Sequence, residues 1–134
     1  MKTLVGIAAL CGLAAGFLSA QEENIRWIRA DGKPMEDKDW QDGGWMRTLG
    51  MLLFGDAPEV RDAEGMQTKD DDFLLLLNAY HEPVKFQLPE DIAGWKWQIS
   101  FDTARPELPV EQESPEGGSV LMEARSCVVL RHEQ

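Results

Sequence analysis

Asp70-Asp71-Asp72-Phe73-Leu74-Leu75-Leu76-Leu77-Asn78-Ala79-Tyr80-His81-Glu82-Pro83 is the stretch that decides the fold. Its apolar run, Phe73 to Leu77, is too short for a free-standing helix and does not alternate, which is typical of a strand covered on both faces. The acids before the run, and Asn78 and Pro83 after it, are signals for the ends of a strand. We therefore predict that this stretch forms the central strand of a small β-domain.

Shorter apolar runs on either side predict further strands. We expect them at 46–54, 84–88, 95–102, 119–122 and 126–130, with irregular loops at 59–69 and 103–118. Because 84–88 follows a His-Glu-Pro turn, it is expected to form a hairpin with the central strand. Alternation in 95–102 predicts one core face made of Trp95, Trp97, Ile99 and Phe101. Short strands separated by turns are typical of an all-β fold, here a small antiparallel β-sandwich.

Residues 1–20 differ in character from the rest of the chain. Lys2 is the only charged residue before Glu22, and Leu4 to Leu18 are almost all apolar or small, as in a secretory signal peptide. This apolar core is shorter than the ~20 residues that a membrane span needs, so no stable span is expected.

Three segments are therefore predicted: a signal-peptide-like segment at 1–20, a loop-rich connection at 21–45, and the sandwich at 46–134. The loop-rich connection contains one expected helical turn, Glu36 to Trp40. A genuine leader predicts a secreted or periplasmic protein, whereas a misassigned translation start predicts a cytoplasmic one.

The charge balance limits the choice of partners. The chain has 24 acidic and 13 basic side chains, which gives a formal net charge of −11. Nucleic acids and anionic membrane surfaces attract positive patches, so neither is expected as a partner. Cys127 is the only cysteine after the signal-like segment and cannot form an internal disulfide there, so we expect a small buried hydrophobe.

No catalytic constellation is evident in the sequence. It lacks a Gly-rich phosphate loop, a nucleophile elbow, and cysteine or histidine pairs at metal-ligand spacing, so we assign no catalytic residue, no metal site and no cofactor. His81 and His132 are expected to be solvated, and the Asp70–Asp72 acids are expected to form a solvated strand start.

Three tryptophans, Trp27, Trp40 and Trp45, are the candidate substrate-binding residues. Indole rings stack on the apolar face of a sugar ring, because both surfaces then leave water. The alternative is that these side chains hold a long loop against the sheet, as large aromatic residues more often do.

Several motifs resemble one enzyme family. Trp27-Ile28-Arg29-Ala30-Asp31-Gly32-Lys33-Pro34-Met35 with Asp39-Trp40, then Arg47-Thr48-Leu49-Gly50-Met51-Leu52-Leu53, then the 72–83 part of the central stretch occur in order. Together with Trp97, Asp102-Thr103 and Ala124-Arg125-Ser126, they resemble the C-terminal region of bacterial glycogen debranching enzymes of the GlgX type. These enzymes form the isoamylase branch of the α-amylase superfamily, and the resemblance covers about residues 24–131.

The resemblance implies a domain without an active site. In that family a (β/α)-barrel hydrolyses α-1,6 branch linkages and the C-terminal β-sandwich packs against it. None of the barrel motifs occurs here, so no catalytic residue carries over. Three readings remain open: a non-catalytic C-terminal domain or fragment of a debranching enzyme, an exported α-glucan-binding module, and an accessory subunit that docks on a separate catalytic barrel.

Overall fold

The structure is a computed structural model that describes residues 24–41, 46–56, 61–107, 112–113 and 118–134. The signal-like segment and Trp45 lie outside these described residues. In chain order the elements are β2 (Ile25–Ile28), α2 (Asp37–Gln41), β3 (Thr48–Leu53), β4 (Asp72–Asn78), β5 (Val84–Gln87), α3 (Glu90–Ala93), β6 (Gln98–Asp102), β7 (Gln112–Glu113), β8 (Ser119–Met122) and β9 (Ser126–His132).

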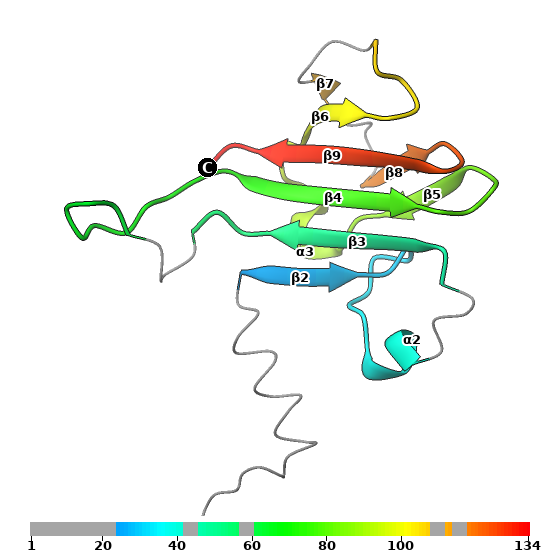
Figure 1. Ribbon diagram of the computed structural model, residues 1–134, viewed down its shortest axis with the longest axis horizontal. Helices are drawn as coiled ribbons and strands as arrows, with labels where there is room; N and C mark the ends of the chain where they lie inside the picture. Colours follow the sequence, from blue (N-terminus) through cyan, green and yellow to red (C-terminus); the bar gives the residue numbers. More distant parts are fainter. Residues whose placement is uncertain (1–23, 42–45, 57–60, 108–111, 114–117) are drawn as a thin grey trace, which may run out of the picture.

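Two antiparallel sheets form the two layers. The large sheet has the strand order β2-β3-β4-β9-β6-β7, and the small sheet consists of β5 and β8. Figure 1 shows β5, β8 and α3 behind the large sheet, so the architecture is the predicted β-sandwich. Strand β4 pairs with β3 on one side and β9 on the other, which confirms its predicted central position.

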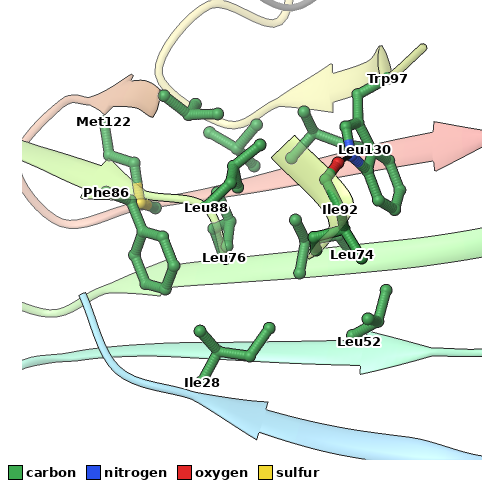
Figure 2. Close-up of a cluster of buried hydrophobic side chains, with 12 residues drawn as sticks. Ile28, Leu52, Leu74, Leu76, Phe86, Leu88, Ile92, Trp97, Met122 and Leu130 are labelled. Atoms are coloured by element: carbon green, nitrogen blue, oxygen red, sulfur yellow. Dashed lines mark hydrogen bonds between the residues drawn. The ribbon is translucent and has the colours of Figure 1, made fainter. Parts of the chain in front are cut away.

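The core lies between the two sheets (Figure 2). The large sheet contributes Ile28, Leu52, Leu74, Leu76, Val128 and Leu130, the opposite layer contributes Phe86, Leu88, Ile92, Val120 and Met122, and Trp97 comes from the segment just before β6. Each of these side chains is at most 3% exposed. The indole of Trp97 donates a hydrogen bond of 2.9 Å to the Ile92 carbonyl, so the polar group of this buried ring is satisfied.

Gly50 makes room for the core ring of Phe86. A Cβ at position 50 would stand 2.8 Å from Cζ of Phe86 and 3.3 Å from Cδ2 of Leu76. Gly50 also pairs with Ile28 on one side and Leu76 on the other. The missing side chain therefore lets the aromatic ring of the second layer lie directly on β3.

The described part of the chain corrects two predicted connections. Residues 25–28 are predicted as part of a loop but form the edge strand β2. The charged Arg26 interrupts the apolar pattern of this strand, and its guanidinium forms an ion pair of 2.7 Å with Asp91 of α3. Strand β5 does not form a hairpin with β4 but pairs with β8. Both edges of β4 are already paired, so β5 passes to the second layer.

A β-bulge corrects the predicted face of β6. The register between β6 and β9 shifts between Ile99 and Phe101, which adds one unpaired residue. Trp97 and Ile99 point to the core as predicted, but Phe101 is 52% exposed and Asp102, predicted on the wet face, is only 5% exposed. The Asp102 carboxylate accepts a hydrogen bond of 2.9 Å from the Ala104 amide and closes the following turn.

The acids that precede β4 are not simply solvated. Asp72 is 2% exposed, and its Oδ1 accepts hydrogen bonds of 2.9 Å from the Gly55 amide and from Nε2 of Gln134. Asp71 forms an ion pair with Arg131. The prediction of a solvated strand start is therefore wrong for Asp72, whose burial is compensated by these two donors.

The outer face of the large sheet is apolar as well. Residues paired directly across neighbouring strands share a face, and the register gives a continuous outward row of Trp27, Met51, Leu75, Val129 and Phe101. Flanking rows add Ile25, Leu53, Phe73, Leu49, Leu77 and Cys127, and the row that contains Phe73 ends in the polar Arg131 and Gln98. An antiparallel sheet that faces water usually has polar residues on that side. Figure 1 shows this near face of the large sheet, which we call the outer face, with no labelled element across it.

The helices play a minor part. Among the described residues α2 has five residues and α3 has four. Neither is long and apolar enough to cross a membrane.

Candidate functional site

Two of the three predicted stacking residues meet at the edge of the large sheet. Trp27 projects from β2 onto the outer face, and Trp40 lies on α2. Their ring centroids are 5.5 Å apart and the rings are nearly perpendicular, at 88°. Trp40 remains 46% exposed. The pair therefore combines packing with an accessible indole, and its role in sugar binding stays a prediction.

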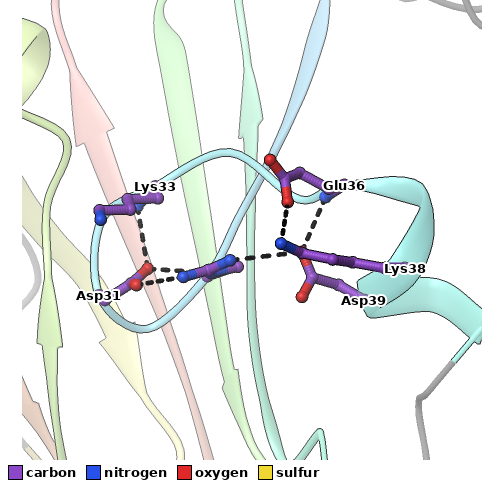
Figure 3. Close-up of polar contacts among 6 residues, drawn as sticks. Asp31, Lys33, Glu36, Lys38 and Asp39 are labelled. Carbon is purple, nitrogen blue, oxygen red and sulfur yellow. Dashed lines mark hydrogen bonds and ion pairs between the residues drawn. The ribbon is translucent and has the colours of Figure 1, made fainter.

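A charged network shapes the loop that follows β2 (Figure 3). The Arg29 guanidinium lies 2.5 Å from the Asp31 carboxylate and 3.6 Å from the Asp39 carboxylate. Asp39 is 3% exposed and also accepts a hydrogen bond of 2.8 Å from the Glu36 amide. The hydrogen bond from Arg29 holds the pKa of the Asp31 carboxyl below its usual range. On α2 itself, Lys38 pairs with Glu36 at 2.7 Å, and this contact raises the pKa of Lys38.

A tight turn fixes this loop against the second layer. Gly32 has a φ of +84°, and a Cβ there would stand 3.1 Å from the backbone carbonyl oxygens of Gln87 and Leu88. The Asp31 carboxylate accepts a hydrogen bond of 3.1 Å from the Lys33 amide across the same turn. Asp31 and Gly32 thereby form a tight turn, which presents Asp31 to the cavity described next.

A cavity of about 550 Å³ lies between this loop and the adjoining ends of β3 and β4. One wall comes from the loop and α2, and the other comes from the segment before β3 and the residue that follows β4. The lining residues are Arg29, Ala30, Asp31, Met35, Lys38, Asp39, Met46, Arg47, Thr48 and Tyr80. This volume is within the range of about 300–1,000 Å³ found for small-molecule sites.

Arg47 and Tyr80 are in contact in the cavity lining, and no sequence motif predicted this contact. The Arg47 guanidinium carbon lies 4.6 Å from the centroid of the Tyr80 ring, which is a cation–π contact. The Ala79 amide donates a hydrogen bond of 2.8 Å to the Arg47 carbonyl, so the two backbones are also joined. The antiparallel register Thr48↔Asn78 brings these residues together, and only the strand pairing could have revealed it.

The histidines behave differently from one another. His81 is exposed in the turn after β4, as predicted. His132, at the end of β9, is half-buried and so only partly solvated: its ring centroid lies 4.7 Å from that of Trp95 and 5.6 Å from that of Trp97. It is a packing residue at the edge of the core.

The environment of Cys127 does not favour a reactive thiol. Cys127 is half-buried on the outer face, and burial raises the pKa of its thiol, which keeps it protonated near neutral pH. Within the described ranges, no cluster of three or more His, Cys, Asp or Glu side chains could hold a metal ion.

Comparison with known proteins places the fold in context. Residues 24–130 match the family model of the isoamylase C-terminal domain. Over 108 residues, the chain is 32% identical to the glycogen operon protein GlgX homologs of Mycobacterium bovis and Mycobacterium tuberculosis. That alignment covers 81% of this chain but 15% of each relative. Because this family model matches most of its length, the chain belongs to the isoamylase C-terminal domain family.

Proposed function

We propose that this chain is a non-catalytic C-terminal β-sandwich domain of a glycogen debranching enzyme. Its role is to pack against the (β/α)-barrel that hydrolyses α-1,6 branch points, and the chain alone is expected to have no hydrolase activity. The observation that carries the proposal is the outer face of the large sheet, because it is apolar across five strands and ready for a partner.

The exposure of this face agrees with a docking role. Leu77 is 44% exposed and Phe101 is 52% exposed, although the neighbouring inner residues Leu76 and Asp102 are at most 5% exposed. Large apolar side chains on a sheet surface gain free energy when another surface removes them from water, by roughly 25 cal/mol per Å². The chain spans about 15% of the length of its curated relatives, which supports a further domain as the partner.

Binding to a catalytic barrel is the direct test. A GlgX-type enzyme from which the matching C-terminal domain has been deleted is mixed with this chain, and complex formation is measured by calorimetry. Debranching of glycogen is then assayed with and without the chain. We expect a complex, and recovery of debranching activity that neither component shows alone.

Substitutions on the outer face give the first prediction. The double change Leu77→Glu and Phe101→Glu is expected to weaken binding to the barrel by about tenfold or more, because two charges would have to lose their water in an apolar interface. The affinity is measured by calorimetry at constant salt.

A matched control comes from the other layer. Leu121 is 53% exposed on β8 of the small sheet, so Leu121→Glu adds one charge, half that of the double variant, at similar exposure away from the outer face. Its affinity for the barrel should be unchanged. Equal weakening by both variants, or by neither, would show that the outer face is not the docking surface.

Glucan binding is the second candidate function, and the exposed ring of Trp40 beside Trp27 favours it. If the chain binds α-glucans by stacking, it is retarded in native gels that contain glycogen, and Trp40→Ala abolishes most of the retardation. Met66→Ala is the control, because Met66 is 66% exposed in a different loop. Unaltered migration in glycogen gels would exclude this function.

The remaining alternatives concern how the chain meets its partners. If the chain is an accessory subunit, it docks on a barrel that is made as a separate polypeptide. If the reading frame directly upstream encodes the barrel, the chain is instead part of one continuous enzyme. The link of the family to glycogen favours the cytoplasmic alternative over export. α-Glucan and a catalytic barrel are thus the partners that we propose.

A further inference from the structure

We propose that the cavity between α2 and the ends of β3 and β4 binds an oxyanion, a phosphate or carboxylate group of a small polar molecule, through the guanidinium of Arg47. The cavity is separate from the outer face, and this proposal does not depend on the proposed docking function. Its evidence is the distribution of charge around the cavity and the geometry of Arg47.

The net charge of the described cavity lining is opposite in sign to the net charge of the whole chain. Among the lining residues that the structure describes, three are basic, Arg29, Lys38 and Arg47, and two are acidic, Asp31 and Asp39, which gives a sum of +1. The complete chain has a formal charge of −11. A cavity with more basic than acidic groups is therefore unusual for this molecule, and it provides a local attraction for an anion.

Most of these charges are already paired. Both acidic side chains of the lining contact Arg29, at 2.5 and 3.6 Å, and Lys38 contacts Glu36 at 2.7 Å. Arg47 differs, since its guanidinium forms no ion pair with any residue that the structure describes. Its guanidinium carbon lies over the Tyr80 ring, 4.6 Å from the ring centroid, and this cation–π contact does not use up its charge in an ion pair.

This geometry suits an oxyanion in particular. A guanidinium is planar and always charged, and its N–H groups form a fork that matches two oxygens of a carboxylate or phosphate. Thr48 and Tyr80, both in the lining, add hydroxyl groups that can donate to the same ligand. The Asp31 carboxylate on the other wall can accept hydrogen bonds from hydroxyl groups of the ligand, so a sugar phosphate or a sugar acid fits the chemistry of both walls.

Calorimetry with four probes distinguishes the possible ligands. The complete chain is titrated with inorganic phosphate, glucose 6-phosphate, gluconate and glucose. We expect saturable binding of at least one anionic probe, with an affinity that falls as salt is added, and at least tenfold weaker binding of glucose. Preference for glucose 6-phosphate or for gluconate identifies the group as phosphate or carboxylate.

Substitutions then assign the binding to Arg47. Arg47→Gln is expected to lower the affinity for the anionic probe by about tenfold or more, because the charge-assisted hydrogen bonds of the guanidinium are lost. Arg47→Lys is also expected to weaken it, since an ammonium lacks the planar fork. Arg61→Gln is the matched control: Arg61 is an exposed arginine outside the cavity lining, and this change should leave the affinity unaltered.

The outcomes decide the proposal in either direction. Arg47 is exposed, so circular dichroism and the melting temperature of Arg47→Gln should match those of the unaltered chain and confirm that it folds. The proposal is overturned if no anionic probe binds, if glucose binds as tightly as glucose 6-phosphate, or if Arg47→Gln and Arg61→Gln have the same affinity as the unaltered chain.

Discussion

Leu76→Ala is expected to lower the free energy of unfolding by about 3–4 kcal/mol, a large share of the stability of a domain of this size. Leu76 is 0% exposed in the middle of β4 and belongs to the core cluster. Its neighbours belong to paired strands that cannot close the gap, so the cavity left by the change stays largely open. Urea unfolding followed by tryptophan fluorescence measures the effect.

The adjacent leucine provides the control. Leu77 follows Leu76 in the same run but points to the outer face, where it is 44% exposed. Leu77→Ala should cost less than about 1 kcal/mol in the isolated chain, because little buried surface is lost. Similar losses of unfolding free energy for Leu76→Ala and Leu77→Ala would contradict the difference in burial between the two faces of β4.

The second large effect is expected at Gly55, which follows β3. A Cβ at this position would stand 2.1 Å from the backbone carbonyl oxygen of Asp70 and 2.5 Å from that of Asp71. These backbone atoms cannot rotate away as a side chain would. Moving them also disturbs the hydrogen bond of 2.9 Å between the Gly55 amide and the buried Asp72 carboxylate. Gly55→Ala is therefore expected to cost about 2–4 kcal/mol.

Gly94 provides the comparison for this change. A Cβ at Gly94, which ends α3, would have no heavy atom within 4 Å, and the φ of −86° suits any residue. Gly94→Ala should alter the free energy of unfolding by less than about 1 kcal/mol. The two variants are compared by the same urea titration, and a loss at Gly94 as large as that at Gly55 would refute the steric argument.

The sequence predicted the central strand because the signal lies within one short run. Five apolar residues with polar stops specify β4 almost to the residue, and the family motifs in the same region indicated the sandwich. The absence of alternation in this run also had a physical basis, since its residues are apolar on the inner and the outer face. A local sequence pattern was sufficient to locate this strand, because that prediction depends only on the residues of the strand itself.

Features that depend on pairing were not predictable in this way. The bulge before Phe101 adds a residue without changing the alternation in the sequence, so only the register with β9 shows that the face changes. The destination of β5 depended on both edges of β4 being occupied. Arg47 and Tyr80 are far apart in the sequence and meet because β3 and β4 are antiparallel neighbours, which is why the cavity had no signal of its own.

The bulge in β6 also decides which side chain of this strand reaches the outer face. If the same residues paired without a bulge, Ser100 would stand opposite Val129, Phe101 would point to the core and Asp102 would turn to the outer face. The single unpaired residue thus places an aromatic group, rather than a carboxylate, on the outer face. Removal of Ser100 would leave both faces as they are, so the strand should tolerate a one-residue deletion better at this position than at its paired neighbours.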